Sequence, residues 1–146
     1  MKILCFLLLN LISLSAMANT QIIFSHDGRP YDGVLTEITF TQLPYSQNFS
    51  ATLRTAYFSR KEHTQIDHTE LLAANLSCQF AGNTSDLMEL NCSIDARPSD
   101  GALIEVIVQK QENGFYNAIL HKNQYSRIEH REIDTVDAIG SNLEMH

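Results

Sequence analysis

The chain has 146 residues, a formal net charge of -7 at pH 7 and a hydrophobic fraction of 44%. This length suits one globular domain, and the apolar content is typical of a folded protein rather than a disordered one. The acidic balance and the scattered lysines and arginines exclude the dense basic surface that nucleic-acid binding requires. We therefore expect no nucleic-acid partner.

Residues 1–18 have the pattern of a secretory signal peptide. Lys2 provides a positive start, an apolar run follows, and Ala16-Met17-Ala18 forms a small-residue cleavage site. The apolar run is shorter than the roughly 20 residues that a membrane-spanning helix needs. We predict cleavage after Ala18 and export to the periplasm or the extracellular space. The remainder, residues 19–146, is expected to form a single β domain that does not span a membrane.

Residues 34–42 and 48–58 predict two strands. In the first, Ile38 and Phe40 alternate with polar side chains, as in a strand with one buried face. The second has one apolar face, formed by Phe49, Ala51, Leu53 and Tyr57. Segments rich in Gly, Pro, Asp and Ser separate the strands and predict turns. We identify no internal repeat and no linker.

Residues 61–70 contain the richest group of polar side chains. His63, Asp67 and His68 combine imidazole and carboxylate groups, which can bind a divalent metal or act as a general base. The spacing of the two histidines, however, fits neither one face of a helix nor one face of a strand. A solvated loop between two strands is the favoured interpretation, so no metal, cofactor or catalytic residue is assigned. These three residues remain the metal-site candidates.

Cys78 and Cys92 are the two cysteines that follow the predicted signal peptide. Alternating apolar residues flank a polar turn between them, which predicts a hairpin with Phe80 opposite Leu90 and Cys78 opposite Cys92. Directly opposed residues in antiparallel strands have Cα separations that suit a disulfide. A redox pair would normally be C-x-x-C, and a zinc site needs four ligands. We therefore predict a structural disulfide.

Residues 102–122 predict a second hairpin around Asn113-Gly114, a preferred pair for a two-residue type I′ turn. That turn would place Val108 opposite Ile119, Ile107 opposite Leu120 and Glu105 opposite Lys122. His121 would then lie opposite Val106, as a strand histidine at a surface or rim. The first strand is apolar on both faces, so a second layer must cover it.

The C-terminal residues 123–146 are ambiguous. Ile133, Val136, Ile139 and Leu143 recur at helical spacing, which suits a short amphipathic helix. A loose tail or, for residues 125–133, an edge strand with charged side chains would also fit the sequence.

Together these patterns predict a mainly β protein, a small antiparallel barrel or sandwich of seven to eight strands with a possible short C-terminal helix. We find no catalytic motif, and we expect an exported, non-enzymatic binding or interaction protein. Its partner would be an unknown protein or a small apolar ligand held in a barrel cavity. The alternative is a small hydrolase or metal-dependent enzyme that uses His63, Asp67 and His68.

Overall fold

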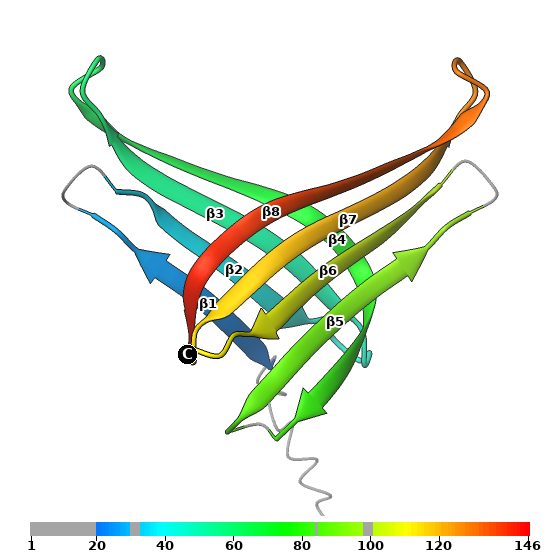
Figure 1. Ribbon diagram of the computed structural model, residues 1–146, viewed down its shortest axis with the longest axis horizontal. Helices are drawn as coiled ribbons and strands as arrows, with labels where there is room; N and C mark the ends of the chain where they lie inside the picture. The colour runs from blue at the N-terminus through cyan, green and yellow to red at the C-terminus, as the bar shows by residue number, and fades with distance from the viewer. Residues whose placement is uncertain (1–19, 30–32, 84, 98–100) are drawn as a thin grey trace, which may run out of the picture.

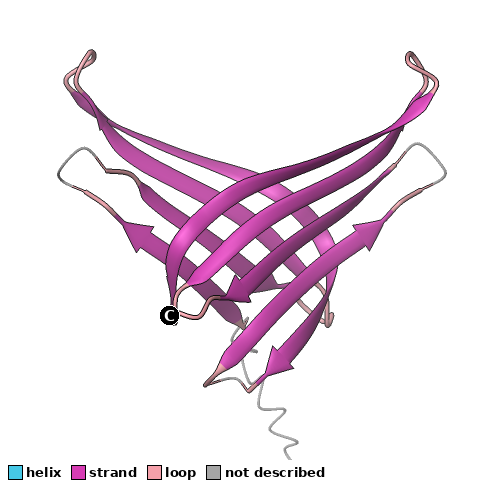
Figure 2. Cartoon of the chain, viewed as in Figure 1, coloured by secondary structure: helices cyan, strands magenta, loops and turns pink. Residues whose placement is uncertain are grey.

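The computed structural model describes residues 20–29, 33–83, 85–97 and 101–146, so the predicted signal peptide, residues 1–18, lies outside the described residues. The described residues form eight antiparallel strands and no helix, which confirms the predicted β class (Figure 2). The strands are β1 (Gln21–Asp27), β2 (Leu35–Gln42), β3 (Phe49–Ser59), β4 (Thr64–Gly82), β5 (Leu87–Asp95), β6 (Ala102–Lys110), β7 (Tyr116–Ser126) and β8 (Arg131–Met145). Within these ranges no helix could cross a membrane.

The strands follow one another around a closed barrel in sequence order (Figure 1). The two long strands β4 and β8 each pair with one neighbour along their first part and with the other neighbour along their second part. The first part of β4 pairs with β3 and its second part with β5, while β8 pairs first with β7 and then, at its end, with β1. Because β4 and β8 change partner midway, the β3–β4 and β7–β8 hairpins extend beyond the barrel on opposite sides (Figure 1). We call residues 57–66 the first arm and residues 125–132 the second arm.

The core lies inside the barrel and is apolar. Phe24 packs edge-on against Phe40 and Tyr116, with ring centroids 6.2 and 5.1 Å away. The hydroxyl of Tyr116 donates a 2.6 Å hydrogen bond to the Leu87 carbonyl, so burying this ring leaves no unmet polar group. The other fully buried large side chains are Ile38, Leu76, Leu90, Leu143, Val106, Val108 and Cys92. Burying each large apolar side chain contributes about 1.5–3 kcal/mol, which makes this interior the main source of stability.

The predicted strand over residues 48–58 forms, but its apolar alternation stops where the strand leaves the barrel. Phe49 and Ala51 are buried as expected, and Ala56 rather than Tyr57 is buried further along. Tyr57 is exposed because the first arm has no opposing sheet to cover it.

The predicted cysteine hairpin is confirmed with its register. Cys78 pairs with Cys92 and Phe80 with Leu90, on β4 and β5. The two cysteines form a disulfide across a Cα separation of 4.0 Å.

The predicted register of the β6–β7 hairpin is wrong by one residue. Gln111 N donates to Phe115 O and Gly114 N donates to Gln111 O, so the loop has three residues, and only Gly114 of the Asn-Gly pair takes a positive φ, 86°. Asn113 instead accepts a hydrogen bond from Phe115 N through its side chain. This is a type I turn closed by a left-handed glycine, not the type I′ turn.

The correction changes the cross-strand neighbours of β6. Ile107 faces Ile119, Glu105 faces His121, and Lys122 moves opposite Ile104. A slip of one residue reverses which side chains of a strand point inward. Tyr116, Ala118 and Leu120 therefore enter the core, and His121 lies on the outer face beside a carboxylate rather than opposite Val106.

The C-terminal residues 123–146 form neither a helix nor a loose tail. They complete β7, turn at residues 127–130 and run back as β8 to Met145. Part of the apolar spacing that suggested a helix comes from irregular pairing: the β7–β8 register shifts between Ala118 and Ile119, where Ile139 is an extra residue in β8, and again between Tyr116 and Ala118. Val136, by contrast, lies in regular β8 and is exposed. A bulge changes the phase of alternation and can imitate a helical period.

The structure also corrects the expectation that the chain has no internal repeat, because β1–β4 and β5–β8 are two copies of one unit. SHDGRPYDG at residues 25–33 matches SIDARPSDG at 93–101, and SRKEH at 59–63 matches SRIEH at 126–130. Two rarely adopted backbone conformations recur as well: His63 and His130 have φ of 51° and 53°, and Asn75 and Asn142 have φ of 59° and 52°. The barrel therefore has an internal pseudo-twofold arrangement (Figure 1).

The repeated Asp-x-Arg turn shows how closely the halves correspond. In the first half, Asp27 accepts bonds from Arg29 N at 3.0 Å and Arg29 Nε at 2.8 Å. In the second, Asp95 accepts from Arg97 N at 3.0 Å and Arg97 Nε at 2.9 Å. The side-chain hydrogen bonds from the arginines lower the pKa of both carboxyl groups to about 2.

Candidate interaction surface

The predicted metal-site candidates do not converge. His63 lies in the turn of the first arm, Asp67 follows on β4, and His68 is the next residue along the same strand. Successive side chains of a strand point to opposite faces, so Asp67 and His68 face apart. Asp67 is held by Arg54 Nη2 at 2.6 Å, and this hydrogen-bonded partner lowers the pKa of its carboxyl group. In the described parts of the chain, no group of three or more His, Cys, Asp or Glu side chains could hold a metal ion.

The tips of the two arms have the same construction. Ser59 Oγ accepts a bond from Glu62 N at 3.2 Å, and Ser126 Oγ accepts one from Glu129 N at 3.1 Å. A histidine in the left-handed conformation ends each turn. These contacts explain why serine recurs at the start of each tip and why the last position needs a residue that tolerates positive φ.

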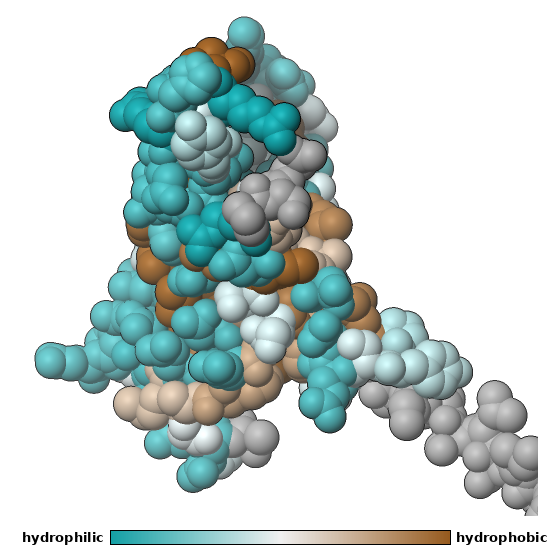
Figure 3. Space-filling model, turned by 90° about the vertical axis from the view of Figure 1, so that its right-hand side faces the viewer, coloured by the Kyte–Doolittle hydropathy of each residue, from teal (hydrophilic) through white to brown (hydrophobic). Residues whose placement is uncertain are grey.

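An exposed aromatic residue precedes each tip. Phe58 and Tyr125 occupy equivalent places and are each 57% exposed. The second arm adds Ile128, and Val136 is also exposed on β8 just beyond that arm. Figure 3, which faces the side from which the second arm extends, shows apolar residues among hydrophilic ones up to the upper end of the molecule. Each arm therefore presents the sequence aromatic-Ser-Arg-x-Glu-His to solvent.

The bases of the arms hold equivalent charged groups. At the first arm, Arg54 of β3 pairs with Asp67 of β4, and the charge of Glu37 on β2 also raises the pKa of Arg54. At the second arm, His121 of β7 lies between Glu105 of β6 and Asp134 of β8. The sequence analysis did not predict this second group, because the incorrect β6–β7 register placed His121 opposite Val106 instead of Glu105.

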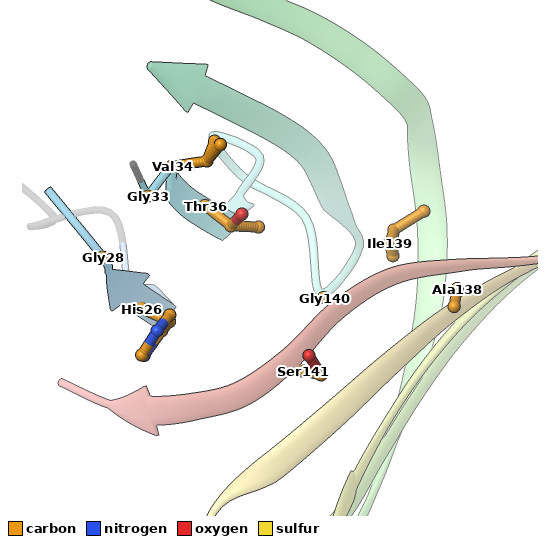
Figure 4. Close-up of a pocket in the computed structure, with 9 residues that line it drawn as sticks. All are labelled: His26, Gly28, Gly33, Val34, Thr36, Ala138, Ile139, Gly140 and Ser141. Atoms are coloured by element: carbon orange, nitrogen blue, oxygen red, sulfur yellow. The ribbon is translucent and has the colours of Figure 1, made fainter. Parts of the chain in front are cut away.

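A surface pocket of about 420 Å³ lies where β8 diverges from the ends of β1 and β2. Figure 4 shows His26, Gly28, Val34 and Thr36 on one side of it and residues 138–141 on the other. Several small residues, among them Gly28, Gly33 and Gly140, leave this space open. Among its described lining residues, His26 is the only titratable one, and Thr36 and Ser141 add hydroxyl groups.

Sequence reasoning offered an edge strand as one alternative for residues 125–133 but did not identify the second arm as a hairpin. Tyr125, Glu129 and His130 were assigned to an ambiguous segment because their neighbours have mixed periodicity. The signal that could have found them is the repeat FSRKEH and YSRIEH, at residues 58–63 and 125–130.

No protein-family model matches the chain, and no curated protein or solved structure shows a significant match to it.

Proposed function

We propose that this is an exported, non-enzymatic binding protein that recognises a protein partner through its two arms. The observation that carries the proposal is the repetition of aromatic-Ser-Arg-x-Glu-His at two exposed hairpin tips. The equal exposure of Phe58 and Tyr125, 57% each, supports an equivalent role for the two tips.

The fold alone does not require this repetition. Serine and histidine are explained by the turn, but an exposed aromatic residue gains nothing from the folded state, since leaving it in water forgoes the free energy of burial. Some core positions differ between the halves, as where Phe40 corresponds to Val108, and others are kept, as where Leu76 corresponds to Leu143. An exposed aromatic ring that occurs at both tips without a packing role supports a contact with another molecule. Aromatic and arginine side chains are the types that dominate binding energy at protein interfaces.

Two equivalent sites on one chain would also allow bivalent binding. When one arm is bound, the other searches for its site at high effective concentration, so the overall affinity exceeds that of either arm. A partner with two equivalent epitopes would gain most from this arrangement.

The packed barrel interior favours a surface partner over a small apolar ligand. Phe24, Phe40 and Leu90 are completely buried in the space that such a ligand would need. The described pocket is formed instead at the ends of β1 and β2, beside residues 138–141 of β8.

Export is supported by two observations. The N-terminal sequence predicts a signal peptide, and the Cys78–Cys92 disulfide is compatible with an oxidising compartment, where such bonds persist.

Photo-crosslinking tests the proposal. A benzophenone amino acid is placed at Phe58, at Tyr125, or at the control Met88, which is exposed at the start of β5, away from both arms. In the native host, we expect the two arm positions to capture the same protein and Met88 to capture none. The proposal fails if neither arm captures a protein, or if all three positions give the same products.

A further inference from the structure

The base of the second arm contains a histidine placed between two carboxylates on neighbouring strands. His121 Nδ1 lies 3.4 Å from Glu105 Oε2 on β6, and His121 Nε2 contacts Asp134 Oδ1 on β8. The side chain is only 23% exposed. This single ring therefore connects three adjacent strands, one in the barrel and two that continue into the arm.

The first half has a permanent cation at the equivalent place. Arg54 occupies the place of His121, Asp67 that of Asp134, and Glu37 that of Glu105. Arg54 donates to Asp67 from Nε at 3.0 Å and from Nη2 at 2.6 Å. Arginine stays charged at all physiological pH values, whereas histidine loses its charge near neutrality.

We infer that the second arm is attached to the barrel by a protonation-dependent lock, which the first arm lacks. Protonated His121 has two N–H donors, one for each carboxylate. Neutral His121 has one donor and one acceptor, so one carboxylate then faces a ring nitrogen that cannot donate to it. The inference concerns the free protein and does not depend on the proposed partner.

The charges around the ring set the direction of the response. On β6 the facing group is Glu105 and on β8 it is Asp134, while Arg97, in the β5–β6 turn, carries a charge that interacts with Glu105 and Glu132. Hydrogen bonds to Asp134 and then to Glu105 raise the pKa of His121 above its usual 6.5. A raised pKa in the folded state means that the lock is complete below about pH 6.5 and is lost as the pH rises through the raised value.

The arm is sensitive to this loss because its two strands continue beyond the end of the neighbouring strand β6. Beyond Gln124, which pairs with Ala102 at the start of β6, the second arm is a two-stranded ribbon. Isolated ribbons of two strands are marginally stable in water. Loosening the base should therefore increase opening of residues 125–132 while the barrel remains folded.

Amide hydrogen exchange of the full mature protein between pH 5 and pH 8.5, corrected for intrinsic base catalysis, tests this inference. We expect protection of residues 125–132 to fall about twofold to fivefold relative to the first arm as the pH rises, the range that partly exposed ion pairs give. A ¹⁵N-detected titration of His121 should show its midpoint in the same pH interval.

Exchanging the cationic residues at the bases of the two arms supplies matched controls. His121→Arg should remove the pH dependence of the second arm, and Arg54→His should introduce one into the first. The inference is overturned if the two wild-type arms respond identically to pH, or if His121→Arg leaves the response of the second arm unchanged. Both of these outcomes are measured without Arg54→His, so the test still decides the question if that variant misfolds.

Discussion

The two halves of the barrel share their turns and arms but close the barrel in different ways. Where β4 meets β5, six residue pairs and the Cys78–Cys92 disulfide join the strands. At the equivalent junction of β8 and β1 there are two pairs, Phe24–Met145 and Ser25–Glu144. The cysteines of one junction correspond in sequence to Met145 and Phe24 of the other. One position in the repeat can therefore be stabilised either by a covalent bond or by a buried aromatic ring.

The shorter junction is reinforced by the C-terminal residue. His146 N donates to Ile23 O at 2.8 Å, and the His146 ring lies 2.8 Å from Ser25 Oγ. The main apolar contribution to this junction comes from Phe24, which contacts Phe40 and Tyr116. The two junctions should thus respond to different substitutions.

The largest expected effect is at the β8–β1 junction. Phe24→Ala should lower the free energy of unfolding by about 3–5 kcal/mol, because it removes a fully buried ring and leaves a cavity. Urea denaturation measures this change, and Phe24→Leu serves as the control that keeps most of the volume. If both variants match the wild type, Phe24 does not support the junction.

A somewhat smaller effect is expected at the β4–β5 junction. Replacing both Cys78 and Cys92 with Ala releases a loop with a sequence separation of 14, which should cost about 3 kcal/mol through the entropy of the unfolded chain. Denaturation of the double variant and of the reduced wild-type protein should agree. A double variant as stable as the oxidised protein would show that the six backbone pairs suffice.

The smallest expected effect concerns the repeated Asp-x-Arg turn, and it should be the same in both halves. The pKa values of Asp27 and Asp95 are lowered from 3.8 to about 2. Lowered values in the folded state stabilise it above pH 4, and this contribution is lost as the pH falls toward 2. Asp27→Asn and Asp95→Asn should each reduce the acid dependence of the urea midpoint by a similar amount. A reduction in only one variant would contradict the equivalence of the two turns.

Much of this fold follows from local patterns in the sequence. The alternation around Ile38 and Phe40 and the opposed phases around Cys78 and Cys92 identify strands and a disulfide, because side chains alternate strictly in flat strands. The patterns fail where the backbone departs from that regularity. The turn at Gly114 adds a residue, and the bulge at Ile139 shifts the phase. Neither departure can be recognised from hydrophobicity alone.

These same irregularities of the backbone limited the prediction of the candidate site. A one-residue error at Gly114 paired Glu105 with Lys122 and so concealed its contact with His121. The arms were concealed for another reason: their residues pack against no core, so they leave no periodic signal, and the repeated SRKEH and SRIEH segments are what identifies them.

The affinity of the arm-captured partner for four forms of the protein tests the central claim most directly. These are the wild type, Phe58→Ala, Tyr125→Ala and the double variant, all of which should retain the wild-type melting temperature because both rings are exposed. We predict that each single substitution weakens binding by a similar factor of about tenfold or more, and that the double variant loses binding almost entirely. If one substitution abolished binding and the other had no effect, the two arms would not be equivalent and the account would be contradicted.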